Sequence, residues 1–185
     1  MVADVSGDGV PAALIMAAFR ALLRYNAKLF SNPDHLMKLM NEQVAEFMRK
    51  RDFISVFYGI LDHKSHVFSY CNCGHNPAIL WKENKISSLE GGGPSLNLLK
   101  DADFKSSNLQ LDKDDQILFY TDGVIEVFSK DKNQFGLDRL IDLFEANINR
   151  SANKIITEII ESTKSFSSSD FYNDDFTLLV LKRKN

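Results

Sequence analysis

The spacing of hydrophobic residues divides the start of the chain into one strand and two helices. Met1–Val5 is the apolar end of a strand, and the run that begins at Pro11 predicts a helix to about Phe30. From Leu36 onward, apolar residues recur at intervals of three and four. This spacing predicts a second amphipathic helix that ends near the basic residues 49–51.

The pattern then changes to β-branched and aromatic residues, which favour antiparallel strands joined by short turns. Strands are predicted at Phe53–Leu61, His66–Cys73, Ala78–Trp81, Phe104–Leu111 and Gln116–Thr121, with a flexible loop at 91–94. A helical period returns towards the C-terminus. It predicts helices at Gly136–Asn147 and Ser151–Thr163, a polar loop at 165–170 and a closing strand at Phe176–Leu181.

The order of these elements decides the fold class. Helices and strands are grouped rather than alternating, which predicts an α+β domain with helices that cover mainly antiparallel sheet. We expect one domain over residues 1–185, since no linker or internal repeat divides the chain. The first strand is already half complete at residue 1, so an upstream segment is expected to be missing.

Composition and charge narrow the class of protein. The 185 residues are 44% hydrophobic and 25% charged, which is typical of a soluble globular chain. A formal net charge of -3 gives no basic excess for binding nucleic acid. There is no secretory signal and no apolar run long enough for membrane insertion, and the only two cysteines are near neighbours in the chain. These features predict a cytoplasmic protein.

Three acidic clusters lie next to turns at predicted strand ends. They are Asp4, followed by Val-Ser-Gly-Asp-Gly, then Asp122 with its following glycine, and the pair Asp174-Asp175. Carboxylates at the ends of buried strands are costly to gather unless a cation neutralises them. Oxygen ligands without His or Cys favour Mg²⁺, Mn²⁺ or Ca²⁺. Each cluster alone also suits an ordinary turn, and spacing does not show that the three converge.

Six segments occur in the order of the motifs of one enzyme family. The chain resembles the SpoIIE/RsbU-type branch of the metal-dependent serine/threonine phosphatases, in the protein phosphatase 2C superfamily. The matching segments are ADVSGDGVPAA at 3–13, CGHNP at 73–77, GGPSL at 92–96, TDGVIE at 121–126, FGLDRL at 135–140 and DDFT at 174–177. The resemblance covers essentially the whole chain and implies a four-layer α/β/β/α sandwich whose first strand or strands precede Met1.

The resemblance also implies the metal ligands. These would be Asp4, the backbone carbonyl of Val5, Asp122 and one member of the pair Asp174 and Asp175, of which Asp174 fits the family pattern better. Asp4 would bridge two ions, Mn²⁺ or Mg²⁺, and Asp4, Asp122 and Asp174 would be the catalytic residues. A hydroxide that bridges the two ions would attack phosphorus in line, without a covalent phosphoenzyme.

Substrate and partners follow from the same resemblance. It implies hydrolysis of phosphoserine or phosphothreonine on a phosphorylated anti-anti-sigma (STAS-type) protein, within sigma-factor regulation and under the control of an upstream sensor or regulatory domain. Asp8 stands where the family commonly has Lys, and Asn97 where it commonly has Gly. The family's upstream acidic residue would precede Met1, so we expect low activity from this chain alone. The missing strand would leave a sheet edge through which a homodimer could form.

Other interpretations compete with the phosphatase. A catalytically silent signalling module with the same fold is the main alternative. A haloacid-dehalogenase-like phosphatase needs an Asp-x-Asp pair and alternating βα units, and an ATP-dependent kinase needs a glycine-rich phosphate loop. Cys71, Cys73 and His75 could form a partial zinc site, but buried structural cysteines and a turn-supporting histidine explain them better. The basic residues 49–51 are expected to be a solvated helix end, with steering of phosphate as the alternative.

Overall fold

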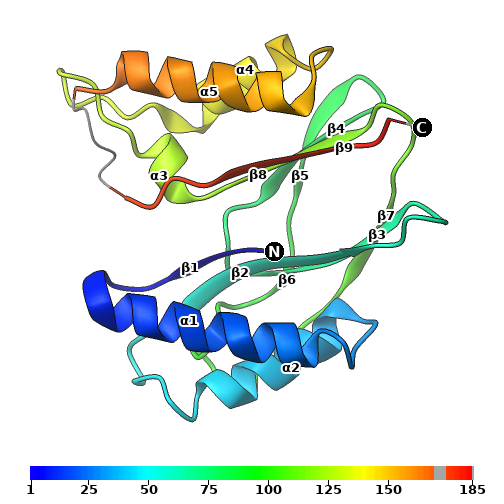
Figure 1. Cartoon of the computed structure of the whole chain (residues 1–185), viewed down its shortest axis with the longest axis vertical. Helices are drawn as coiled ribbons and strands as arrows, with labels where there is room; N and C mark the ends of the chain where they lie inside the picture. The colour runs from blue at the N-terminus through cyan, green and yellow to red at the C-terminus, as the bar shows by residue number, and fades with distance from the viewer. Residues whose placement is uncertain (169–173, 185) are drawn as a thin grey trace. The chain divides into compact units, whose positions relative to one another are not determined.

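The computed structural model describes residues 1–168 and 174–184. By their internal contacts these residues form two compact units. The first unit contains Met1–His75 and Glu90–Leu111, and the second contains Asn76–Leu89 and Asp112–Asn185. Each unit has its own sheet and its own helices (Figure 1).

The first unit is a five-stranded sheet with two helices. Its elements are β1 (Val2–Val5), α1 (Gly9–Asn26), α2 (Pro33–Val44), β2 (Ile54–Leu61), β3 (Val67–Cys73), β6 (Gly92–Gly93) and β7 (Ser107–Gln110). The strand order is β1-β2-β3-β6, and β7 also pairs with β3. Every pairing is antiparallel except that between β3 and β6.

Side-chain alternation gives this sheet two different faces. Val5, Ile54 and Cys71 belong to the hydrophobic cluster that α1 and α2 complete, so they point towards the helices. Because successive side chains of a strand point to opposite faces, Asp4 and Ser55 lie on the other face. The helices α1 and α2 lie along the first face (Figure 1).

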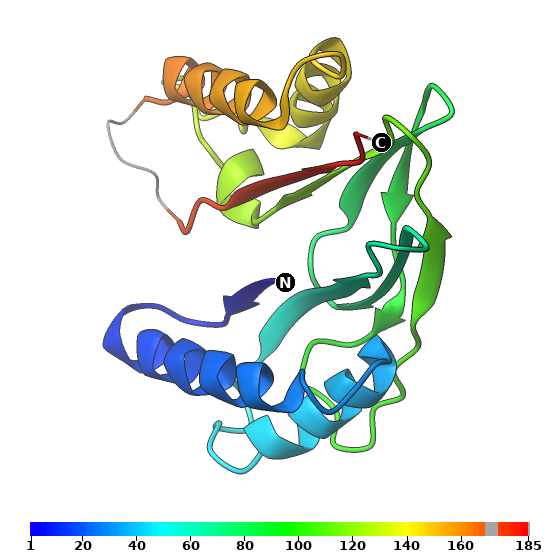
Figure 2. The same cartoon turned by 45° about the vertical axis from the view of Figure 1, so that its right-hand side comes forward.

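The second unit is a four-stranded antiparallel sheet with three helices. Its elements are β4 (Ala78–Lys82), β5 (Lys85–Leu89), β8 (Gln116–Tyr120), α3 (Asp122–Ile125), α4 (Gly136–Ala146), α5 (Ala152–Phe166) and β9 (Leu178–Lys182). The strand order is β5-β4-β8-β9, and Figure 2 shows β9 (red) beside β8. The core lies between this sheet and the helices, where Leu118 of β8, Phe144 of α4 and Ile159 of α5 are fully buried.

The predicted α+β class with mainly antiparallel sheets is confirmed, while several boundaries differ. The first helix begins at Gly9 rather than Pro11, and the second ends at Val44, before the basic residues 49–51. The elements β5 and α3 were not foreseen. The helix α5 continues to Phe166 into the predicted polar loop at 165–170, and residues 169 and 170 of that loop lie outside the described residues.

The prediction of a flexible loop at 91–94 was wrong. Gly92 and Gly93 form β6, which pairs in parallel with Asn72 and Cys73 at the end of β3. Gly92 has a φ of 131°, and a Cβ atom there would collide with the backbone of Asn72. The glycines therefore serve close approach of two backbones rather than flexibility.

A search of the helices for membrane-spanning segments found none with enough length and hydropathy, within the part of the chain that the structure describes.

Candidate functional site

The first acidic cluster is built on β1, at the edge of its sheet. Asp4 is half-buried and stands opposite Ser55 of β2, and Val5 stands opposite Ile54. Ile54 exchanges both of its backbone hydrogen bonds with Leu96, at 2.9 and 3.1 Å. In an antiparallel ladder such a residue does not bond its direct partner, so the peptide groups of Val5 point away from β2. The Val5 carbonyl is therefore directed to the outer side of the sheet edge, as a backbone ligand requires.

The turn after Val5 is tied to the start of β2. The backbone N–H of Ser6 donates to the Phe53 carbonyl at 2.9 Å, and the Ser6 hydroxyl accepts from the Phe53 N–H at 2.8 Å. Gly7 and Gly9 have φ angles of 89° and 67°, which glycine adopts without strain. Asp8, between them, is exposed and makes no capping bond to α1. The bonds between Ser6 and Phe53 and the two glycines thus fix the course of the chain directly after Asp4 and Val5.

A buried polar group lies beside Asp4 on the same face of the sheet. The Ser55 Oγ and the His75 Nδ1 are 2.8 Å apart. The Asn72 side chain accepts from the His75 N–H at 2.8 Å and donates to the His75 carbonyl at 3.0 Å. All three residues are buried. The Asn72 side chain thus holds the turn at His75, and the His75 ring links this turn to Ser55 of β2, a site residue that the sequence reasoning missed. Its signal is a single serine among the aliphatic and aromatic residues of the run 54–58.

The second and third acidic clusters are held together in the second unit. Asp122 is half-buried and is the first residue of α3, directly after β8. The Thr121 hydroxyl donates to the Asp175 carbonyl at 2.6 Å and accepts from the Thr177 N–H at 2.9 Å. The backbone N–H of Thr121 also donates to the Thr177 carbonyl at 3.2 Å. Thr121 therefore joins the Asp174–Thr177 segment, through three hydrogen bonds, to the end of β8 that Asp122 follows; we call this link the clip.

Gly123 explains the glycine of the Thr-Asp-Gly motif. A Cβ atom at this position would lie 2.6 Å from the Asp175 carbonyl oxygen, closer than real Cβ atoms approach. Asp174 and Asp175 are both exposed, and the Asp174 carboxylate accepts from the Asp175 N–H at 2.7 Å. The structure thus brings the backbone of Asp174 and Asp175 next to the start of α3 without favouring either carboxylate as the ligand.

The ligands implied for the metal belong to both units. Asp4 and Val5 are in the first, and Asp122 and Asp174 are in the second. Among the residues that the structure describes, no three His, Cys, Asp or Glu side chains gather into a group that could hold a metal ion. The convergence of the acidic clusters therefore stays a prediction. The donor set itself, three carboxylates and an outward backbone carbonyl, consists of oxygen atoms and suits Mg²⁺ or Mn²⁺.

The cysteines do not form a zinc site. Cys71 and Cys73 are fully buried in the core of the first unit, with their sulfur atoms 3.6 Å apart. The hydrogen bond with Cys71, together with burial, raises the pKa of the Cys73 thiol. The His75 ring bonds Ser55 on the opposite face of the sheet. The prediction of buried structural cysteines is confirmed.

Comparison with protein families assigns the chain. Residues 1–184 match the family described as Stage II sporulation protein E (SpoIIE). The chain belongs to the SpoIIE family. This membership extends over both compact units, because the match includes the Asp4 turn in the first unit and the Asp174–Thr177 segment in the second.

Individual members and structures support the SpoIIE assignment. The chain is 33% identical to phosphoserine phosphatase RsbU of Bacillus subtilis over 187 residues, which is 99% of this chain and 55% of RsbU. The RsbU and RsbW domains of Rv1364c from Mycobacterium tuberculosis match with a TM-score of 0.77 and 28% identity, over 98% of this chain and 50% of that one. The SiaA-PP2C domain of Pseudomonas aeruginosa has a TM-score of 0.84 at 15% identity, over 99% and 73%.

The extent of these matches limits what they transfer. The SiaA-PP2C likeness shows that the fold is of the PP2C type. The chain spans between 33% and 55% of the length of the curated relatives that it matches. Activities, substrates and partners of those longer proteins are therefore proposals for this SpoIIE-family chain.

Proposed function

We propose that residues 1–185 form one phosphatase domain that hydrolyses phosphoserine or phosphothreonine on a regulatory protein with the help of divalent metal. The observation that carries this proposal is the clip between Thr121 and the Asp174–Thr177 segment, which puts two acidic motifs of the chain side by side. Membership of the SpoIIE family and the likeness to a phosphoserine phosphatase support it.

The chain's own residues would supply the binding and positioning for this reaction. Asp4, the Val5 carbonyl, Asp122 and Asp174 would hold two Mn²⁺ or Mg²⁺ ions, with Asp175 as the alternative to Asp174. When bound, such ions lower the pKa of water and neutralise phosphoryl oxygens. Thr121 would keep Asp122 and the Asp174 carboxylate at a fixed separation. Carboxylates gathered in this way would repel one another, and a bound cation would relieve that repulsion.

The substrate class and the pathway extend the same proposal. We infer that the substrate is a phosphorylated anti-anti-sigma (STAS-type) protein in sigma-factor regulation, and that an upstream sensor or regulatory domain controls the chain. The resemblance to the phosphoserine phosphatases RsbU and RsbP supports the substrate class, and the partial coverage of these longer relatives supports control by a further domain. Within the described residues β1 pairs only with β2, so a homodimer through the edge of that sheet is part of the proposal.

Release of inorganic phosphate from a phosphoserine protein tests the proposal. The chain, and a version extended upstream, would be assayed with Mn²⁺ and with a chelator. We expect chelator-sensitive phosphate release that falls by roughly a hundredfold or more in Asp122→Asn, as loss of a metal ligand does. Asp142→Asn, an exposed acid on α4, is the matched control and should keep full activity. Absence of release from both versions would contradict the proposal and favour the silent signalling module.

A further inference from the structure

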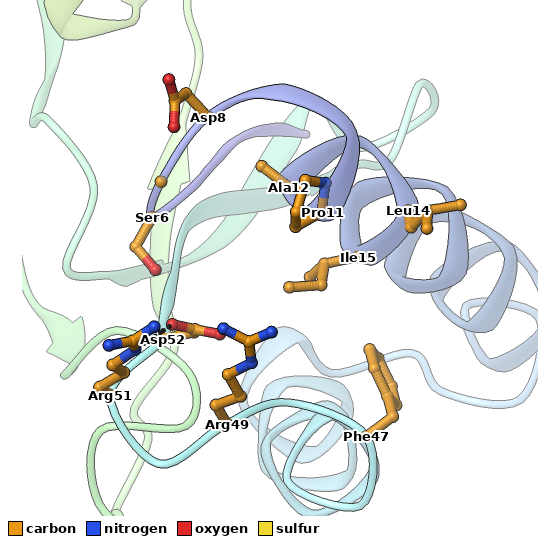
Figure 3. A pocket seen from close by; sticks show the side chains of 11 residues that line it. Ser6, Asp8, Pro11, Ala12, Leu14, Ile15, Phe47, Arg49, Arg51 and Asp52 are labelled. Carbon is orange, nitrogen blue, oxygen red and sulfur yellow. Dashed lines mark ion pairs between the residues drawn. The ribbon is translucent and has the colours of Figure 1, made fainter.

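A pocket of about 480 Å³ opens beside the turn that follows Asp4 and Val5. Its lining residues all belong to the first unit (Figure 3). Ser6, Gly7 and Asp8 form one wall, the first turns of α1 form the second, and the segment from Phe47 to Asp52 forms the third. Two of the proposed metal ligands, Asp4 and Val5, therefore lie next to a concave surface to which the metal chemistry assigns no role.

The third wall carries positive charge. The side chains of Arg49 and Arg51 lie on the same side of the pocket, and Asp8 lies across from them (Figure 3). The guanidinium of Arg51 is 3.8 Å from the Asp52 carboxylate, and the Arg51 side chain remains 79% exposed. Arg49 makes no ion pair with any residue that the structure describes. The Arg49 guanidinium is thus available to an acidic ligand, since the nearby carboxylate of Asp52 pairs with Arg51.

The segment that carries the arginines is held in place by hydrogen bonds. The Asn97 side-chain amide donates to the carbonyls of Arg49 at 2.9 Å and Asp52 at 2.7 Å. Asn97 has a φ of 70°, and its N–H donates to the Asn41 side chain at 2.8 Å. The Ser6–Phe53 bonds fix the other end of this wall. A surface fixed in this way loses little conformational freedom when a ligand binds.

The second wall is apolar and accessible. Leu14 of α1 is 67% exposed, and Phe47, at the adjoining end of the third wall, is also apolar and is 43% exposed. Pro11 and Ile15 complete the second wall. A ligand that satisfies both walls needs an anionic group for Arg49 and an apolar side chain close to it. A free anion such as phosphate would contact only the third wall, which carries the arginines.

We propose that this pocket binds a segment of the protein substrate in which an acidic residue stands next to an apolar one. The inference rests on the proposed phosphatase function and adds to it the means of choosing a substrate. The pocket wall begins at Ser6, two residues after Asp4, so the bound segment would flank the phosphorylated residue in the substrate chain. Arg49 is then a specificity-determining residue that acts through binding.

Fluorescence anisotropy with unphosphorylated peptides tests this pocket without any hydrolysis. The probes are a short labelled peptide in which Asp and Glu flank Leu, and a counterpart with Lys at both acidic positions. We expect the acidic peptide alone to bind, more weakly at high salt, and about tenfold more weakly in Arg49→Ala. Lys50→Ala, a neighbouring cation outside the pocket lining, should bind as the unaltered protein does. Asp8→Asn removes the opposing carboxylate and should tighten binding by about twofold.

Several outcomes would overturn the proposal. Equal binding of both peptides, or equal losses in Arg49→Ala and Lys50→Ala, would show only diffuse charge attraction. Full affinity in Phe47→Ala together with complete competition by inorganic phosphate would show a simple anion site. Failure of the phosphatase proposal is distinguishable, because peptide binding would persist while no phosphate is released. In an active protein, Arg49→Ala should raise KM for an acidic phosphopeptide about tenfold with kcat unchanged, and a fall in kcat would contradict a binding role.

Discussion

The Thr121 hydroxyl lies 2.6 Å from the carbonyl oxygen of Asp175, to which it donates a hydrogen bond. The same oxygen atom of Thr121 accepts from the Thr177 N–H at 2.9 Å. Thr121 is almost fully buried, so water does not substitute for these partners. The residue before one acidic motif thereby fixes the other, although more than fifty positions separate them in the sequence.

Replacing Thr121 by Val tests this link. The substitution keeps the shape of the side chain but removes a buried donor and acceptor, which leaves the Asp175 carbonyl and the Thr177 N–H without their partner. We expect the free energy of unfolding to fall by about 1–3 kcal/mol and the Mn²⁺-induced stabilisation to shrink. Urea unfolding with and without Mn²⁺ measures both. Thr157→Val removes an exposed hydroxyl that bonds within α5 and should change neither quantity appreciably.

Ser55→Ala probes the buried group beside Asp4. The change removes the partner of the His75 Nδ1 at 2.8 Å while β2 keeps its backbone bonds. A buried ring nitrogen that loses its partner costs about 1–3 kcal/mol, which thermal unfolding would detect. Ser69→Ala, which removes an exposed side-chain bond to Asn108, is the control and should cost less than about 1 kcal/mol. Equal losses in the two variants would show that Ser55 has no special role.

A substitution at Asn97 can weaken the hydrogen bonds that hold the Phe47–Asp52 wall of the pocket (the arginine wall) without changing either arginine. Asn97→Gly keeps the φ of 70° accessible but removes the two bonds to the carbonyls of Arg49 and Asp52. We expect binding of the acidic peptide to weaken several-fold through lost preorganisation, with only a modest loss of stability. Asn97→Ala should be less stable than Asn97→Gly, because alanine is strained at positive φ. Unchanged peptide affinity in Asn97→Gly would contradict the role of this anchor.

The cysteine pair gives a pH-dependent prediction. An unfolded thiol ionises near pH 8.5, whereas the hydrogen bond with Cys71 and burial raise the pKa of Cys73 in the folded state. Above pH 8.5 the unfolded state therefore binds fewer protons at Cys73 than the folded state does. The contribution of Cys73 to the free energy of unfolding thus declines as pH rises. At pH 9 iodoacetamide should label neither thiol in the native protein and both in guanidinium. Rapid native labelling of Cys73 would contradict its burial.

The sequence predicted the elements whose burial is regular. The β-branched and aromatic run Phe53–Leu61 is buried on both faces of its strand at 54–58, and the spacing of three and four in the last two helices reflects one apolar face, so strands and helices appear there as expected. The strand β5 (Lys85–Leu89) was missed because it is mostly exposed and polar. The strand β6 was missed because its glycines carry no side-chain pattern and form a strand only by lying against β3.

The site was predictable where a motif carries the chemistry itself. The acidic residues stood out because each lies beside a turn at one end of a strand. The residues that position them did not, because Ser55 and Thr121 act through partners that are distant in sequence. The same holds for Asn97, whose departure from glycine became intelligible only through its bonds to the arginine wall. Contacts of this kind depend on tertiary packing, which local propensity does not encode.

Thermal unfolding with increasing Mn²⁺ tests the central claim most directly, namely that Asp122 and the Asp174–Asp175 pair form part of a metal site. Metal that binds only the folded state adds about 2.7 kcal/mol at a hundred times its Kd, which raises the midpoint by roughly 5–10 °C. We expect this rise in the unaltered protein and in Asp142→Asn. In Asp122→Asn we expect little or no rise, with a metal-free midpoint that is unchanged or higher because one repelling carboxylate is gone. An equal Mn²⁺-induced rise in Asp122→Asn, or no rise in the unaltered protein, would contradict the account.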